Sequence, residues 1–167
     1  AGDAITTANN NVLLGYASGT ALTVGADNVA IGTASLFVDT KGSHSVAIGR
    51  SALSAQNFTS ATNTYNTAVG SGAGGAVSTG VSNTLIGGLA GDALTDADNN
   101  VAVGKEALST DTLGSRSVAI GTAALFTQNF TSATDAYNTA VGHFAGGSVT
   151  TGVKNTIIGG LAGDAIT

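Results

Sequence analysis

The chain has 167 residues, enough for one domain or one stretch of a repeat protein, and 43% of them are hydrophobic while 9% are charged. This balance disfavours intrinsic disorder, and the net charge of −5 disfavours nucleic-acid binding through phosphate contacts. The chain has no cysteine, which excludes disulfides and thiolate metal sites, and it has no apolar run approaching the about 20 residues of a membrane-spanning helix.

A five-residue word recurs along the whole chain, in the order NVLLG, NVAIG, SVAIG, NTAVG, NTLIG, NVAVG, SVAIG, NTAVG and NTIIG. Successive words start 17 residues apart, except for two steps of 21 residues, from Ser45 to Asn66 and from Ser117 to Asn138. The longer steps contain two similar inserts, QNFTSATNTY at 56–65 and QNFTSATDAY at 128–137. A fixed period indicates a solenoid, in which each repeat forms one turn.

Each word has the pattern of a short β-strand that ends in glycine. If its Asn or Ser is position zero, position 1 is Val or Thr and position 3 is Ile, Val or Leu. Residues two apart point to the same face of a strand, and β-branched residues favour strands. The glycine that follows permits a corner with positive φ. These corner glycines are Gly15, Gly32, Gly49, Gly70, Gly87, Gly104, Gly121, Gly142 and Gly159. We predict an all-β parallel β-roll, or β-solenoid, of about nine turns.

The second half of each turn comes in two kinds. In one kind a leucine stands eight residues after position zero, as in Leu36, Leu53, Leu108 and Leu125. In the other kind a glycine stands there and an apolar residue follows three positions later, as in Leu22, Val77, Leu94, Val149 and Ile166. Two apolar segments in each turn predict a narrow, packed interior. The seven Asn and two Ser at position zero predict a ladder of side chains about 4.8 Å apart, bonded between turns.

A longer period overlies the short one. Four turns make a 72-residue unit, so that 28–99 matches 100–167 at most positions. The sequence AGDAIT both opens and closes the chain. We therefore interpret 1–167 as a single repetitive segment and expect it to be a fragment of a longer fibre.

The middle residue of the word is apolar in all nine turns. If positions 1 and 3 point into the roll, this residue points outward, and an apolar outer face indicates contact with another copy of the chain. The reverse arrangement, with core and interface exchanged, is open at this stage. The predicted interface residues are Leu13, Ala30, Ala47, Ala68, Leu85, Ala102, Ala119, Ala140 and Ile157.

The repeated word resembles the head repeats of trimeric autotransporter adhesins, the YadA-like or haemagglutinin-type β-roll. Longer stretches such as NTAVGHFAG, VTTG, NTLIGGLAGDALTDADNNVAVG and LGSRSVAIGTAAL resemble the tail-fibre repeats of marine bacteriophages. The resemblance covers the whole chain, although the common adhesin head period is shorter than these 17-residue turns. It implies a left-handed roll, a tight homotrimer, and a place on a virion tail fibre or, alternatively, on a bacterial outer surface.

The sequence contains no catalytic constellation, and we expect neither an enzyme nor a bound cofactor. It has no nucleophile elbow, phosphate loop or zinc-ligand spacing, and its two histidines, His44 and His143, occupy non-equivalent positions several turns apart. Asp96 and Asp98 faintly resemble a calcium loop but lack the other ligands at fixed spacing, so no metal site is predicted beyond this weak candidate.

The inserts are the best candidates for recognition, because loops on a rigid scaffold often carry binding residues. Their aromatic residues are Phe58, Tyr65, Phe130 and Tyr137, and the alternative is that these rings pack against the roll. The leading functional hypothesis is a rigid trimeric spacer of a phage tail fibre that supports host attachment. A host glycan or protein is a possible partner, whereas nucleic acid and membrane insertion are not expected.

A bacterial adhesin head is the alternative function, and an ice-binding solenoid is a minor one. The latter hypothesis comes from a threonine-rich column twelve residues after position zero, which Asn57 and Asn129 interrupt. The threonines of this column are Thr23, Thr40, Thr95, Thr112, Thr150 and Thr167.

Overall fold

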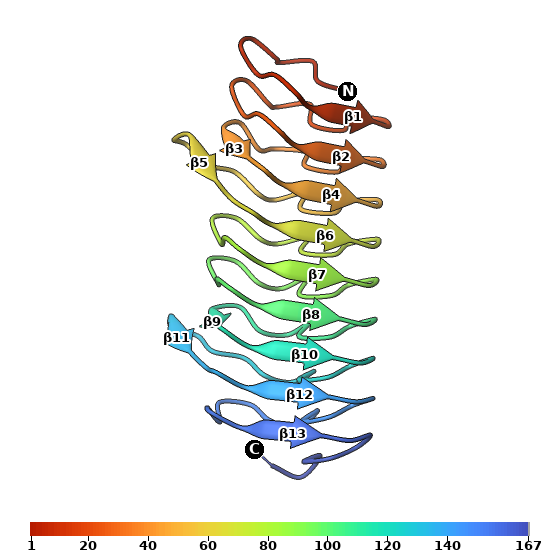
Figure 1. Cartoon of the computed structure of the whole chain (residues 1–167), viewed down its shortest axis with the longest axis vertical. Helices are drawn as coiled ribbons and strands as arrows, with labels where there is room; N and C mark the ends of the chain where they lie inside the picture. Colours follow the sequence, from red (N-terminus) through yellow and green to blue (C-terminus); the bar gives the residue numbers. More distant parts are fainter. Residues whose placement is uncertain (167) are drawn as a thin grey trace.

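The computed structural model describes residues 1–166 and confirms the all-β parallel solenoid of about nine turns (Figure 1). Each word forms one strand of a nine-stranded sheet with the order β1-β2-β4-β6-β7-β8-β10-β12-β13. The strands are β1 (Val12–Leu14), β2 (Val29–Ile31), β4 (Val46–Ile48), β6 (Thr67–Val69), β7 (Thr84–Ile86), β8 (Val101–Val103), β10 (Val118–Ile120), β12 (Thr139–Val141) and β13 (Thr156–Ile158).

Equivalent residues of successive words pair directly in this sheet. Val12 lies opposite Val29 and Val29 opposite Val46, one turn further along the axis. The pairing continues across the longer turns without a shift, since Val46 lies opposite Thr67 and Val118 opposite Thr139. The four extra residues of these turns are therefore accommodated outside the main sheet.

The inserts form two small parallel ladders at one edge of the solenoid. β5 (Thr62–Asn63) pairs with β3 (Gly42–Ser43), and β11 (Thr134–Asp135) pairs with β9 (Gly114–Ser115). In Figure 1 the two insert strands, β5 and β11, project from the same side of the stack. The inserts are thus ordered extensions of the scaffold.

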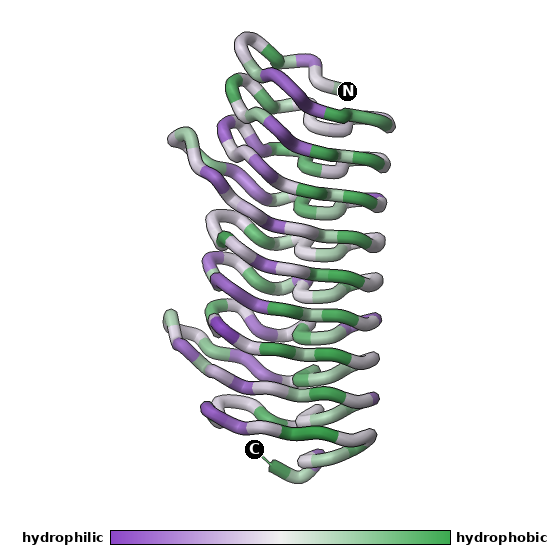
Figure 2. Tube along the Cα trace, in the orientation of Figure 1, coloured by the Kyte–Doolittle hydropathy of each residue, from purple (hydrophilic) through white to green (hydrophobic). Residues whose placement is uncertain are grey.

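The strand side chains point in the direction opposite to the predicted one. The middle residues, from Ala30 to Ile157, belong to the hydrophobic core of the single chain, and Leu13 packs against that core. The nine predicted interface residues, Leu13, Ala30, Ala47, Ala68, Leu85, Ala102, Ala119, Ala140 and Ile157, are therefore interior residues, and this prediction was wrong. The side chains at positions 1 and 3 point outward instead, and Figure 2 shows the strands as a hydrophobic column along the stack.

Volume explains this orientation. Turns with Leu36, Leu53, Leu108 or Leu125 inside have alanine in the middle of the strand. Turns with a larger middle residue have a glycine in place of that leucine, as in Leu85 with Gly91. A Cβ atom on Gly91 would lie 2.7 Å from Leu85 Cδ2, so the two positions cannot both be large. A narrow close-packed interior therefore takes the small middle residues and leaves the β-branched ones outside.

The corner glycines adopt the predicted positive φ, with values between 127° and 142°. They also stack on one another from turn to turn. A Cβ atom on Gly87 would lie 2.5 Å from the carbonyl oxygen of Gly104 and 2.6 Å from its carbonyl carbon. The glycine column is therefore required both for the backbone conformation and for the close approach of neighbouring turns.

This constraint predicts a sharp difference between two adjacent glycines. Gly87→Ala should destabilise the fold by about 3 kcal/mol or more, because it adds a main-chain collision to backbone strain of about 1–3 kcal/mol. Gly88→Ala is the matched control, since a Cβ atom there would have Ser71 O as its nearest contact, at 3.9 Å. Urea unfolding followed by circular dichroism measures both, and equal midpoints for the two variants would contradict the stacking argument.

Candidate functional site

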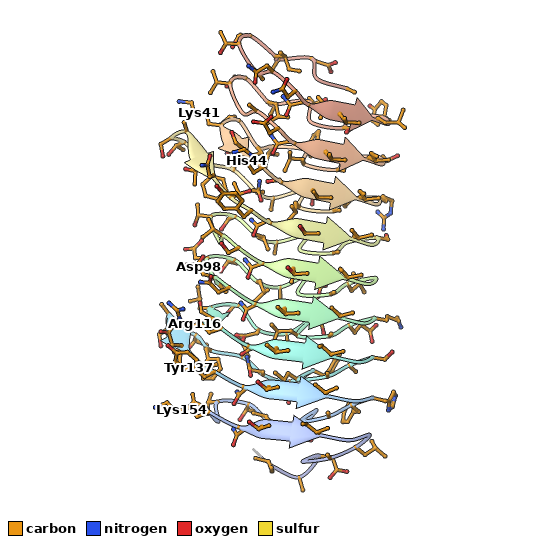
Figure 3. All side chains as sticks on the ribbon, viewed as in Figure 1. Lys41, His44, Asp98, Arg116, Tyr137 and Lys154 are labelled. Atoms are coloured by element: carbon orange, nitrogen blue, oxygen red, sulfur yellow. The ribbon has the colours of Figure 1, made fainter. Side chains whose placement is uncertain are left out.

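Residues 1–166 enclose no pocket, so a binding site in this part of the chain must lie on the outer surface. The described residues also contain no helix long and apolar enough to cross a membrane. The edge that carries the inserts is the best candidate site. Figure 3 shows Lys41, His44, Asp98, Arg116, Tyr137 and Lys154 along this edge.

The two insert phenylalanines are not recognition residues. Phe58 and Phe130 are 7% and 6% exposed, so both rings are buried beneath the insert. Thr40 Oγ1 donates to the carbonyl oxygen of Phe58 at 2.9 Å, and Thr112 does the same for Phe130. The alternative stated for the insert aromatics, packing against the roll, therefore holds for the phenylalanines, and the prediction that they recognise a ligand was wrong.

A buried polar network holds the base of the first insert. Asp39 is fully buried, and its Oδ1 accepts hydrogen bonds from the main-chain N–H groups of Gly42 at 3.0 Å and Phe58 at 3.2 Å. Gln56 Nε2 donates to Asp39 Oδ2 at 2.6 Å and to Ser45 Oγ at 2.8 Å. Asn66 Nδ2 completes the network by donating to Gln56 Oε1 at 2.8 Å. The insert is therefore tied to the interior of two turns.

The second insert repeats this network. Gln128 Nε2 donates to Asp111 Oδ2 at 2.6 Å and to Ser117 Oγ at 3.1 Å, and Asn138 Nδ2 donates to Gln128 Oε1 at 2.7 Å. The residue that corresponds to Thr64, which bonds Ser45 Oγ at 2.6 Å, is Ala136 in this copy. The core of the network is thus conserved between the two units while its periphery varies.

Position zero explains why serine accompanies the insert. In an ordinary turn, Asn83 Oδ1 accepts from the N–H of Asn100 at 2.9 Å and Asn83 Nδ2 donates to the Ala97 carbonyl oxygen at 2.8 Å. The predicted ladder is therefore present, but its bonds go largely to the main chain. Ser45 and Ser117 stand at position zero of the two turns that contain the inserts, and there the serine hydroxyl accepts a hydrogen bond from the amide of Gln56 or Gln128. Serine at position zero was the sequence signal for the buried network, which sequence reasoning missed.

Tyr65 and Tyr137 lie on the surface, as a recognition role requires. Tyr65 is 58% exposed and stacks on His44, with ring centroids 5.4 Å apart and an angle of 5° between the ring planes. Asn63 Nδ2 donates to the Tyr65 hydroxyl at 3.4 Å, and His44 Nδ1 lies 3.9 Å from Asp27 Oδ2. The Tyr65 ring is therefore ordered while it remains accessible.

Tyr137 has a different, charged neighbourhood. Arg116 lies over its ring, with Cζ 5.9 Å from the centroid, and Arg116 Nε forms an ion pair with Asp135 Oδ1 at 2.9 Å. An arginine guanidinium is positively charged in proteins, and the hydrogen bond to Asp135 raises the pKa of Arg116 further. Tyr137 also donates to Asp135 Oδ2 at 3.3 Å. The two inserts thus share a scaffold but present different chemistry.

The weak metal candidate has a structural role. Asp96 Oδ1 accepts hydrogen bonds from the hydroxyl groups of Ser78 and Thr79, and Asp98 Oδ1 accepts one from the N–H of Val81 at 2.8 Å. Within residues 1–166 no three His, Cys, Asp or Glu side chains are arranged to share an ion. Asp96 and Asp98 therefore join one turn to the next.

The threonine column is also engaged between turns. Thr23 Oγ1 donates to the Thr40 carbonyl oxygen and Thr95 Oγ1 to the Thr112 carbonyl oxygen, each at 3.0 Å. Thr167, the last member of the column, lies outside the described residues. The hydroxyl protons of Thr23 and Thr95 are therefore directed to the main chain of the next turn.

Comparisons with known protein families, curated proteins and solved structures find no match to this chain.

The buried network predicts a large effect of a single substitution. Asp39→Ala should destabilise the fold by about 2–3 kcal/mol, because it leaves the Gly42 and Phe58 N–H groups without their acceptor and removes one of the two acceptors of the Gln56 amide. Thr33→Ala changes an exposed side chain of the same turn, at a residue with ordinary negative φ, and should alter stability by less than about 0.5 kcal/mol. Thermal unfolding compares the two, and similar losses would show that the network does not anchor the insert.

Two aspartates predict opposite dependences on pH. Burial raises the pKa of Asp92 above its ordinary 3.8, and the negative charge of Glu106 raises it further. Asp92 Oδ1 is buried and has no hydrogen-bond partner. Hydrogen bonds from Thr79 and Ser78 lower the pKa of Asp96. Ionisation of Asp92 therefore lowers the stability of the folded state as the pH rises above 3.8. Ionised Asp96 has the opposite effect: it stabilises the folded state above pH 3.8, and this stabilisation is lost as the pH falls through the lowered pKa of Asp96.

Asp92→Asn should consequently raise the melting temperature at pH 7, and Asp96→Asn should lower it. Both differences should shrink once the pH falls well below 3.8, where the replaced carboxyl groups are protonated in the folded and unfolded states. Calorimetry at a series of pH values measures the two variants side by side, and shifts of the same sign at neutral pH would refute the assignment.

Proposed function

We propose that this chain is a segment of the rigid shaft of a trimeric fibre, such as a phage tail fibre, that holds an attachment tip away from the particle. The observation that carries the proposal is the outer face of the nine-stranded sheet, in which one column is aliphatic in every turn and the other consists of valine and threonine. Its two columns are Val12, Val29, Val46, Thr67, Thr84, Val101, Val118, Thr139 and Thr156, and Leu14, Ile31, Ile48, Val69, Ile86, Val103, Ile120, Val141 and Ile158.

This face extends along all nine strands of the sheet. Nine strands about 4.8 Å apart extend over roughly 40 Å, and each adds a pair of mainly β-branched side chains to the same surface. Ile86 and Ile120, in the middle of the stack, are each 39% exposed. An apolar stripe of this length on a soluble single chain is unusual, and contact with identical chains around an axis would cover it.

The number three and the fibre setting come from the resemblance of the repeated word to tail-fibre and adhesin-head repeats. The same geometry suits the head of a bacterial surface adhesin, which is the alternative placement. In either setting the regular pairing of strands favours a stiff rod whose length grows with the number of 72-residue units. The proposed role is therefore mechanical and involves no bond-making chemistry.

Light scattering coupled to gel filtration tests this proposal. The wild-type chain should elute as a folded species with the mass of three chains. Val101→Lys combined with Val103→Lys should abolish that species, because two buried charges in each chain would then face the axis. Thr122→Lys is the control, since Thr122 is exposed beyond the end of β10 and should leave the trimer intact.

A wild-type chain that is folded by circular dichroism and has the mass of one chain would overturn the proposal. If the double variant does not fold, the mass of the wild type and of Thr122→Lys still decides the question.

A further inference from the structure

The residue that precedes each word lies at one corner of the turn, next to the inserts. All nine of these residues have φ between 52° and 64°. Because the words pair in register, neighbours in this column are one turn, or about 4.8 Å, apart. The corner column comprises Asn10, Asp27, His44, Tyr65, Ser82, Asn99, Arg116, Tyr137 and Lys154. It therefore arranges nine side chains one above another.

Only one face of the Tyr65 ring is covered by its neighbour in the corner column. His44, one turn before it, stacks nearly parallel to the ring. Ser82, one turn after it, is exposed and has a side chain too short to cover a phenol ring. The hydrogen bond from Ser82 N–H to the Thr64 carbonyl oxygen, 2.7 Å long, places this residue at the adjacent level. The second face of Tyr65 is thus open to a ligand.

The open space has a defined height. Asn99, which is also exposed, is the next member of the corner column after Ser82, and its N–H donates to the Val81 carbonyl oxygen at 3.0 Å. Tyr65 and Asn99 are therefore two turns, or about 10 Å, apart along the axis. We call the space between them, above Ser82, the Ser82 slot. Once the thickness of the flanking side chains is subtracted, it has room for one ring.

The second insert provides a natural comparison in which a longer side chain stands at the position of Ser82. Tyr137 corresponds to Tyr65, but Lys154 stands where Ser82 stands, and its N–H likewise donates to Ala136 O at 2.7 Å. Figure 3 shows Tyr137 and Lys154 at neighbouring levels of the same edge. The four-carbon stem of a lysine can lie along an apolar ring face while its ammonium group remains in water. The Ser82 slot therefore has a short side chain at its base, whereas its counterpart has a long one that can reach over the Tyr137 ring.

The surroundings of the slot indicate the class of ligand. An aromatic face binds the apolar C–H face of a sugar ring, and hydroxyl and amide groups at its rim bind the sugar hydroxyls. Tyr65 supplies the ring, and Ser82 and Asn99 supply the polar rim. A nucleic-acid base is disfavoured by the net charge of −5. We propose that the Ser82 slot binds one neutral pyranose ring of a host glycan, a function beyond the mechanical role of the shaft.

Titration calorimetry tests this with three neutral probes, cellotriose, lactose and tri-N-acetylchitotriose, on the full chain. At least one probe should bind with millimolar affinity and one site per chain. Tyr65→Ala should weaken that binding about tenfold, in keeping with the loss of one stacking contact. Tyr137→Ala is the matched control and should leave binding unchanged, because Arg116 lies over one face of this ring and the Lys154 side chain can reach the other.

Two exchanges between the copies sharpen the test. Ser82→Lys introduces the longer side chain of the second copy, which can cover the Tyr65 ring, and should abolish binding. Lys154→Ser reproduces the open slot and should add a second site on each chain. Both substitutions affect exposed corner side chains, so the circular dichroism spectrum and the mass by light scattering should remain those of the wild type.

Failure of all three sugars to bind at millimolar concentrations would overturn the proposal, as would binding that neither Tyr65→Ala nor Ser82→Lys reduces. A tryptophan-containing peptide that binds in place of the sugars, and is lost in Ser82→Lys, would also overturn it by identifying a protein partner. These outcomes are separable from those for the shaft, since the oligomer mass does not depend on any sugar.

Discussion

The close stacking of one turn on the next is the constraint on which the whole molecule depends. It requires a glycine wherever two corners approach, and this is why Gly87 cannot carry a Cβ atom against Gly104. It also aligns each position-zero asparagine with the main chain of the following turn, where Asn83 bonds both Asn100 and Ala97. A side chain that is compatible with one turn is therefore compatible with its neighbours, and a short word can be repeated along the axis.

The sequence was sufficient to predict the strands, the corners and the period, because these follow from local rules that hold in every turn. It was not sufficient to orient the strands. A word such as NVAIG is apolar on both faces, so alternation cannot distinguish inside from outside, and the answer depends on volume across the turn. The pairing of a large middle residue with glycine, as in Leu85 and Gly91, contained that information, since a narrow interior cannot hold two large residues at one level.

The position of the candidate site could be predicted from the sequence, but the residues that form its surface could be predicted only in part. The inserts were recognisable as interruptions of the period, yet their aromatic residues separate into buried phenylalanines and exposed tyrosines. The local sequence does not distinguish these, because the separation depends on Asp39 and Asp111, which bind the Phe58 and Phe130 N–H groups from inside. Apart from Gln56 and Gln128, the other residues of their column are apolar. A charged residue at a core position of a repeat is thus evidence for a tertiary anchor.

The corner column also bears on how such a protein can change over time. Its side chains contribute little to the interior, and nine different contexts already hold Asn, Asp, His, Tyr, Ser, Arg and Lys in the same backbone conformation. Substitutions there can alter the surface without disturbing the stack. Duplication of a 72-residue unit followed by a few corner exchanges, as between Ser82 and Lys154, would generate a family of rods that share one architecture and differ in what they touch.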